Sequence, residues 1–343
     1  MYSLRQLVTG LQQPSVAKSE MTKRYHQFRS HLPHDIGVQG SYQTGNIGDQ
    51  AIGRTISKQL SAMGQRTRTF GMDIEGSNAP NHILGGGGVL QDWNGTNHLS
   101  KRLNFISEGG AAIGVGVPGF QTSRGRELVR DGLSDVGLIT VRDDWSRRRL
   151  EPYYEGPIQV TACPTLIRED PGELTTERTG VNFRNWYYLD ENIMTEYFGY
   201  ESSLDLVEAR EQYLENIERL CNQVKNPIYI PFHKRDENFA RKNLDIDILP
   251  YEFSDKKTLR RVSAVEKMIC MRYHSLVFAI ICNKPLLPIA YEPKVSELAE
   301  RVDVSSYLPH KHIPAEFEYP DNILELKKSS MENFELLSDY CSF

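Results

Sequence analysis

The sequence predicts an α/β protein of two Rossmann-like domains whose parallel sheets face a central cleft. Three observations favour this class. The chain has 343 residues, more than one typical core holds. Short apolar runs alternate with amphipathic segments along its length, a pattern typical of parallel sheets covered by helices on both faces. A polar, proline-containing stretch at residues 168–179 interrupts this alternation and is the expected linker.

The first half of the chain predicts one domain, residues 35–167. Its apolar runs predict strands at residues 34–42, 67–72, 81–86, 111–117, 137–142 and 157–162. Helices are expected between them at residues 49–64, 97–110 and 145–154. The first helix has the clearest period, because its apolar residues recur every three to four positions at Ile52, Ile56, Leu60 and Met63.

The second half repeats this scheme and predicts a second domain, residues 180–320. Strands are expected at residues 179–184, 226–233, 246–251, 265–274 and 284–291. Helices are expected at residues 202–224, 255–267, 275–282 and 294–302. Residues 1–34 show no clear period and are expected to form an N-terminal arm. Residues 321–343 predict an amphipathic C-terminal helix, whose docking site the sequence does not indicate.

Composition argues against several kinds of partner and compartment. The net charge of -5 implies no general affinity for nucleic acid or anionic membrane, although local basic patches remain compatible with it. The 5 cysteines are odd in number and include no CxxC pair, which fits a reducing compartment. The N-terminus lacks the apolar core of a secretion signal, and no apolar run nears the ~20 residues of a membrane span. We therefore expect a cytoplasmic protein, with peripheral contact at the inner face of the membrane left open.

A glycine loop follows the first expected strand. In TGNIGD, residues 44–49, Gly45 and Gly48 permit a tight turn and the close approach of a ligand. Asp49 stands where a helix N-cap is expected, so one interpretation is a capped structural loop. The other is that Gly45, Asn46 and Asp49 face the cleft, with Asp49 contacting a substrate hydroxyl. No GK[ST] follows, so the loop is not a P-loop.

Four consecutive glycines, residues 85–88, follow the apolar run NHIL. Glycine loses much backbone freedom on folding, so a run of four calls for a reason. Bare backbone here predicts a cleft floor on which a sugar or an anion rests, with Gly86 and Gly87 beneath the acceptor. The alternative is close packing of the two domains across this loop.

Three basic side chains end strands of the second domain. Arg184 ends the run GVNFR, and Arg272 and His274 follow KMIC directly before a helix. Arginine presents a planar fork that matches carboxylate and phosphate, and a helix N-terminus favours an anion. The sequence therefore predicts that these residues bind a small, multiply charged anion. For Arg184 alone, a surface ion pair is the alternative.

Other polar residues near strand ends carry weaker predictions. His233 either contacts the acceptor in the cleft or belongs to a solvated loop. Lys294, beside Tyr291 and Glu292, follows a strand at a helix start and is expected to line the cleft. The Asp143–Asp144 pair resembles a helix cap. No HExxH, no paired Cys or His ligands and no nucleophile elbow are present, so neither a metal nor covalent serine chemistry is expected.

The chain resembles the polysaccharide pyruvyl transferases over residues 37–302. The resemblance rests on TGNIGD, LGGGGVLQD, TVRDDWS, GVNFR and MRYHSLVFAIICNKPLLPIAYEPKVSELAE, in this order. It implies a GT-B-like fold and transfer of the pyruvyl group of phosphoenolpyruvate to a sugar. By the same resemblance, Arg184, Arg272, His274 and Lys294 fall at donor-binding positions. Many members carry Asp-Pro where this chain has Cys163-Pro164, so no role is taken over for that acidic residue.

The resulting expectation is a pyruvyl transferase that forms a pyruvate ketal on two hydroxyls of a glycan or glycan precursor. Phosphoenolpyruvate serves as co-substrate, and no other cofactor is expected. His274 is the expected phosphate contact and proton carrier, and Asp49 the residue facing the hydroxyl. The first domain is assigned to the acceptor and the second to the donor. A lipid-linked acceptor and a homo-oligomer are compatible with the sequence. The alternatives are a GT-B glycosyltransferase that uses a nucleotide sugar and a non-catalytic protein that binds an anionic glycan.

Overall fold

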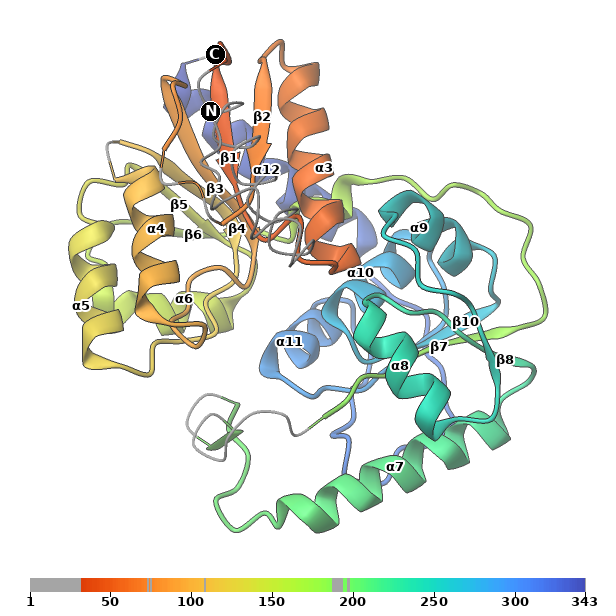
Figure 1. The fold of residues 1–343 in the computed structure, drawn as a ribbon. Helices are drawn as coiled ribbons and strands as arrows, with labels where there is room; N and C mark the ends of the chain where they lie inside the picture. The colour runs from red at the N-terminus through yellow and green to blue at the C-terminus, as the bar shows by residue number, and fades with distance from the viewer. Residues whose placement is uncertain are drawn as a thin grey trace, which may run out of the picture.

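The computed structural model describes residues 32–72, 74, 76–107, 109–186, 194–195 and 198–342. The N-terminal arm predicted for residues 1–34 lies almost wholly outside these residues. Within these described residues the chain forms two parallel sheets, each with helices around it (Figure 1). The predicted α/β class is confirmed.

The first sheet has six parallel strands in the order β2-β1-β3-β4-β5-β6. These are β1(Ile36–Gln39), β2(Thr67–Phe70), β3(Asn81–Gly87), β4(Ala111–Val115), β5(Leu138–Val141) and β6(Ile158–Val160). The helices are α3(Ile47–Ala62), α4(Thr96–Ile106), α5(Ser123–Gly132) and α6(Asp144–Leu150), with short 3-10 helices η1(Glu151–Tyr153) and η2(Pro164–Ile167).

Side chains that alternate along the strands build two cores, one on each face of this sheet. In β3, Ile83 joins the core beneath α3, whereas Leu84 joins the core beneath α4 and α5. Three residues of the predicted helical stripe, Ile52, Ile56 and Leu60 of α3, are inaccessible to solvent, whereas the fourth, Met63, is the C-cap and is half-buried.

The second sheet has five parallel strands in the order β11-β10-β7-β8-β9. These are β7(Thr179–Asn182), β8(Pro227–Tyr229), β9(Asp247–Ile248), β10(Lys267–Cys270) and β11(Leu286–Pro288). The helices are α7(Leu206–Gln223), α8(Lys234–Asn243), α9(Asp255–Ser263), α10(Tyr273–Ile281) and α11(Pro293–Arg301). Every residue of α10 is buried, which accounts for the apolar run SLVFAII.

The C-terminal helix α12(Ile323–Cys341) returns to the first sheet, a placement that the sequence left undefined (Figure 1). It packs against η2, β4 and β5. The buried Asn333 amide anchors it, donating to the Ala162 carbonyl at 2.9 Å and accepting from Thr161 Oγ1 at 2.8 Å and from Thr140 Oγ1 at 2.5 Å. The chain therefore passes between the sheets twice.

In each sheet the order of strands reverses beside the first strand. The reversal lies between β1 and β3 in the first sheet and between β7 and β10 in the second. In open α/β sheets, ligands bind beyond the carboxyl ends of strands at such switch points. The residues that follow these four strands are the natural candidates for a site, and they include the TGNIGD loop, Gly88, Arg184 and Arg272.

Candidate functional site

A cavity of about 750 Å³ lies between the two domains and is lined by residues from both. Its first-domain wall comes from the loops after β1 and β3 and includes Ser41, Thr44, Asn46, Asp49, Gly88 and Trp93. Its second-domain wall follows β7, β8, β10 and β11 and includes Arg184, His233, Asp236, Arg272, His274 and Lys294. Most of the predicted site residues therefore meet in one place.

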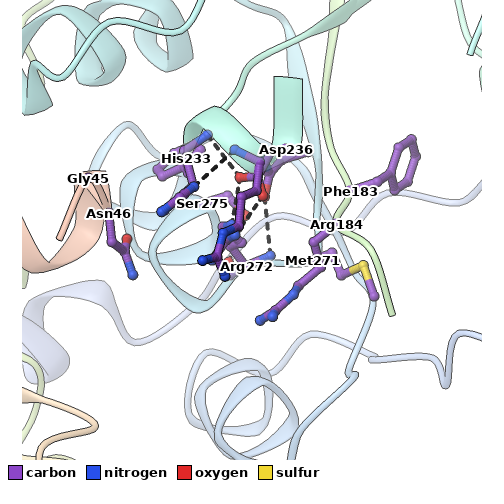
Figure 2. A network of polar contacts seen from close by, with 12 residues as sticks. Gly45, Asn46, Phe183, Arg184, His233, Asp236, Met271, Arg272 and Ser275 are labelled. Atoms are coloured by element: carbon purple, nitrogen blue, oxygen red, sulfur yellow. Dashed lines mark hydrogen bonds and ion pairs between the residues drawn. The ribbon is translucent and has the colours of Figure 1, made fainter. Parts of the chain in front are cut away.

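The two predicted arginines lie at the switch point of the second sheet but in different surroundings (Figure 2). Arg272 donates from Nε and Nη2 to the two carboxylate oxygens of Asp236, each at 2.6 Å. The guanidinium of Arg184 instead lies 4.5 Å from the ring centroid of Tyr291, and its Nη1 is 4.0 Å from Glu292 Oε1. Asp236 compensates the charge of Arg272, so burial of that charge alone does not call for a bound anion.

Asp236 escaped the sequence analysis because α8, which carries it, was not predicted. Its carboxylate is 1% exposed and also accepts from the Phe232 amide at 3.2 Å. It thereby fixes both the start of α8 and the orientation of Arg272. A pair of charge-assisted hydrogen bonds of this geometry holds the guanidinium in a defined plane.

Arg142 is a further basic residue of the cavity that the sequence analysis passed over. It follows β5, is 3% exposed, and donates from Nε to Asp143 Oδ2 at 3.0 Å. Its guanidinium carbon lies 4.3 Å from the ring centroid of Tyr273, and its Nη2 is buried without a hydrogen-bond partner. Gly116 leaves room for it, since a Cβ there would be 2.6 Å from the guanidinium. Its position directly after an apolar strand, like that of Arg184, was the available signal.

His274 is 7% exposed and packs between the first turn of α3 and Cys163. Its Nε2 lies 3.7 Å from Cys163 Sγ, and a Cβ on Gly48 would collide with its Nδ1. Burial, and then the charges of Arg142, Lys294 and Arg272, hold the pKa of His274 well below its usual range. The imidazole is therefore neutral at neutral pH in the absence of a bound anion.

Lys294 lines the cavity from the first turn of α11 and forms an ion pair with Glu292. Glu292 is the N-cap residue of α11 and is 6% exposed. Although burial alone would raise it, the pKa of Glu292 is lowered by the charges of Lys294 and Arg184. Lys294 is thus held at the cavity with its charge intact.

Asp49 lies in the first turn of α3, not at its N-cap as the sequence analysis expected. Asn46 is the cap, because its side-chain oxygen accepts from the Gly48 amide at 3.0 Å. Both residues line the cavity. Burial raises the pKa of Asp49 to about 6, against the lowering effect of Lys294, Arg272 and Arg142. Asp49 can therefore exchange a proton near neutral pH.

The glycine run is mainly architecture, which corrects the expectation of a floor at Gly86 and Gly87. Both are buried in β3 with φ of 55° and 77°, and a Cβ on Gly86 would lie 2.4 Å from Ile52 Cγ2 of α3. A Cβ on Gly85 would meet the Tyr42 hydroxyl at 2.4 Å. Gly88 is the exposed member of the run and the one that lines the cavity. The close packing is between strand and helix within one domain, not across the domains.

Gly45 and His233 meet where the two domains touch. Gly45 has a φ of 84°, and its carbonyl accepts from the Tyr251 hydroxyl at 2.6 Å. His233 is the N-cap of α8, because its Nδ1 accepts from the Arg235 amide at 3.0 Å. A neutral His233 consequently carries its proton on Nε2. In Figure 2, Gly45 and Asn46 lie across from His233 and Arg272.

Asp143 caps α6 by accepting from the Ser146 amide at 2.7 Å, in agreement with the predicted cap. Within the described residues, no group of three or more His, Cys, Asp or Glu side chains is arranged to hold a metal ion. Within the same residues, no helix is long and apolar enough to cross a membrane.

A family model described as polysaccharide pyruvyl transferase matches residues 46–293, which is more than half of the chain. The chain belongs to the polysaccharide pyruvyl transferase family. The match begins at the cap of α3 and ends at the first residue of α11, so it includes Arg142, Arg184, Arg272 and His274. No curated protein matches the chain.

Solved structures similar to this transferase include UDP-GlcNAc 2-epimerase from Methanocaldococcus jannaschii, in complex with UDP-GlcNAc and UDP. It aligns with a TM-score of 0.51 and 11% identity, covering 89% of this chain and 99% of that one. WaaG, a glycosyltransferase involved in lipopolysaccharide biosynthesis, aligns with a TM-score of 0.41 and 10% identity, covering 90% and 93%. At such identities the likeness concerns the fold alone. The fold is GT-B-like, with two Rossmann-like domains facing a cleft, as predicted.

Proposed function

We propose that this family member transfers the pyruvyl group of phosphoenolpyruvate to two hydroxyls of a sugar, forming a pyruvate ketal and releasing phosphate. The observation that supports it best is the convergence of four cationic side chains, Arg142, Arg184, Arg272 and Lys294, on one cavity that also holds His274 and Asp49. They come from both domains and from strand ends at or near the switch points.

The charges suit a small donor with two anionic groups. Asp143, Asp236 and Glu292 offset three of the four cations through ion pairs. Asp49 is partly protonated near neutral pH because its pKa is about 6. When Asp49 is protonated, the four cations exceed the three paired carboxylates by one charge, and the carboxylate and phosphate of phosphoenolpyruvate would meet this excess. In our proposal, Arg184 and the remaining N–H groups of Arg272 and Arg142 hold these two groups.

The reaction requires a proton at C3 of the donor and removal of protons from two hydroxyls. Protonation at C3 makes C2 electrophilic, and a sugar oxygen then forms a bond to C2. The C2–O bond to phosphate breaks, phosphate leaves with that electron pair, and the second hydroxyl closes the ketal. We assign Asp49 to the hydroxyl, since a carboxylate with a pKa of about 6 can accept its proton.

His274 is assigned to the donor phosphate and to proton transfer. Three neighbouring cations and burial keep the imidazole neutral in the empty cavity. A bound dianion or trianion would offset those cations and raise the pKa of His274 again. Donor binding would thereby prepare His274 to carry a proton. Without the donor, the imidazole would stay neutral and carry no extra proton.

The test measures phosphate released from phosphoenolpyruvate in the presence of a panel of galactosides and mannosaminides, free or lipid-linked, with ketal formation followed by mass spectrometry. We expect phosphate release that depends on the sugar, and activity that survives EDTA. Nucleoside diphosphate release from a nucleotide sugar, with phosphoenolpyruvate left intact, would instead favour a glycosyltransferase. Binding of glycan without any turnover would favour a binding protein.

A further inference from the structure

The cavity extends past the proposed donor site along one face of α8. Arg235, Asn238, Phe239 and Lys242 line it, at the spacing that places side chains on a single helix face. We call these four residues the α8 face. Arg235 and Lys242 are about 10 Å apart along the helix axis. Arg210 of α7 lines the same part of the cavity and adds a third cation.

The basic residues of α8 that line the cavity differ from the other basic residues of this helix in whether they form ion pairs. Lys234 and Arg241 do not line the cavity, and both form ion pairs with Glu237, at 2.5 and 2.9 Å. Arg235 and Lys242 line the cavity and form no ion pair with any described residue, and the same holds for Arg210. The helix thus satisfies its outer cations internally and leaves its cavity-facing cations available to a ligand.

The acidic groups of the cavity do not offset this second set of cations. Asp236 binds Arg272, and Glu292 binds Lys294, both within the proposed donor site. Asp49 belongs to the opposite wall, in the first turn of α3. Phosphoenolpyruvate carries one carboxylate and one phosphate, and the proposed donor site engages both. Arg210, Arg235 and Lys242 are exposed to solvent in the cavity and are therefore available to a second anionic group.

We propose that the α8 face and Arg210 bind an oxyanion carried by the acceptor, so that the acceptor is an acidic or phosphorylated sugar and not a neutral one. This inference rests on the proposed function. The sugar ring lies between the two sets of cations, where Trp93 of the first domain offers an aromatic surface and Asp49 faces a hydroxyl. The oxyanion fixes which hydroxyls reach C2 of the donor.

The test is calorimetric binding of three probes to the full chain: N-acetylglucosamine 1-phosphate, glucuronic acid and neutral N-acetylglucosamine. We expect at least one anionic probe to bind the wild type tenfold or more tightly than the neutral sugar, and less tightly as salt concentration rises. The triple variant Arg210→Gln, Arg235→Gln, Lys242→Gln should lose that preference. The control Lys256→Gln changes an exposed cation outside the cavity lining and should keep it.

The two anionic probes distinguish the kind of oxyanion. Tighter binding of N-acetylglucosamine 1-phosphate would indicate a phosphate on the acceptor, and tighter binding of glucuronic acid would indicate a carboxylate. The idea is overturned if the wild type binds all three probes alike, or if the folded triple variant binds the anionic probes as tightly as the wild type does. Phosphoenolpyruvate is titrated separately, and its affinity should be unchanged in the triple variant. Absent donor binding in the wild type would count against the proposed function, whereas the sugar titrations report on the α8 face alone.

Discussion

Two arginines at the same switch point differ in what holds them. Arg272 is fixed by both oxygens of the buried Asp236, so it forms part of a preorganised wall. Arg184 lies over the ring of Tyr291 and is 4.0 Å from Glu292, whereas replacing Arg272 would leave the buried carboxylate of Asp236 without its paired cation. Arg184 is therefore the cleaner residue with which to test the donor site.

Arg184→Ala should weaken phosphoenolpyruvate binding by one to two decades, because a charge-assisted fork contributes about 1.5–3 kcal/mol. Arg184→Lys should recover only part of this, since lysine lacks the planar fork. Calorimetry with the donor measures both. The control is Arg178→Ala. Arg178 stands just before β7 and forms an ion pair with the exposed Asp247. Equal donor affinity in Arg184→Ala and wild type would exclude the site.

Asp49 gives the reaction a pH dependence. Burial raises its pKa to about 6, and as a base it acts only when ionised. The turnover number should therefore rise as the pH increases through about 6, and Asp49→Asn should abolish that limb together with most of the activity. A steady-state pH profile of the two proteins is the measurement. A wild-type profile that is flat between pH 5 and 7 would remove Asp49 from this role.

The same raised pKa has a cost in stability. The folded state binds the proton of Asp49 more tightly than the unfolded chain, whose carboxyl titrates near 3.8. Ionisation therefore disfavours folding as the pH rises from about 4 to about 6, and the cost is complete above that range. Asp49→Asn should stabilise the protein by about 3 kcal/mol at pH 7.5 and by roughly 1 kcal/mol at pH 4.5, since the pKa rises by about two units. Thermal melts at both pH values test this, with the exposed first-turn Asp144→Asn as control; a gain that is equal at both values would contradict it.

At the scale of elements, β3 and α3 explain why the glycine run is conformationally demanding. Gly86→Ala places a methyl group against Ile52 and in a left-handed backbone conformation, so it should destabilise the protein by more than the ~1 kcal/mol of helix or strand propensity. Gly88→Ala meets only Pro118, at 3.2 Å, and should leave the melting temperature nearly unchanged while it affects the acceptor. A melting curve and an acceptor titration for each variant separate the two roles. Normal stability in Gly86→Ala would restore the floor interpretation.

Elements with a strong apolar pattern were predictable, and polar ones were not. Of the eleven strands among the described residues, ten fall within predicted apolar runs and β3 extends one residue beyond its run; α3, α10 and α12 also lie at predicted helices. α5 and α8 were missed because they carry few apolar residues: α5 buries only Gly125 and Val129. Except for β3, predicted strands are longer than the observed ones, since the apolar runs continue into the adjoining loops.

Site residues were predictable where a charged residue follows a strand. The prediction failed where a side chain depends on a contact with a residue from elsewhere in the chain. Arg184, Arg272, His274 and Lys294 do line one cavity. Asp236 could not be assigned without α8, and the packing of Gly86 on Ile52 depends on an approach of helix and strand that no local pattern encodes.

At the scale of the whole molecule, the two domains share one continuous apolar core. The core that lies beneath α3 also includes α10, η2 and α12, and so joins both sheets. Polar contacts reinforce it: the Ile47 amide donates to the Phe232 carbonyl at 2.9 Å, and Arg301 donates to the Arg142 and Thr161 carbonyls at 2.9 and 2.7 Å. Because Arg301 and Lys294 both belong to α11, the same contacts help to hold the two walls of the cavity in register.

This shared core implies that the protein unfolds as one unit, and Asn333 of α12 offers a way to test it. Asn333→Ala removes the acceptor of the Thr140 and Thr161 hydroxyls and the donor to the Ala162 carbonyl, all of them buried. Buried groups that lose their partners cost about 1–3 kcal/mol each, so a loss of roughly 2–4 kcal/mol is expected after relaxation. Differential scanning calorimetry should show a single transition at lower temperature, whereas the exposed control Glu335→Ala should leave it in place. Two separate transitions, with only the first-sheet domain shifted, would show instead that the domains fold independently and that α12 stabilises one of them alone.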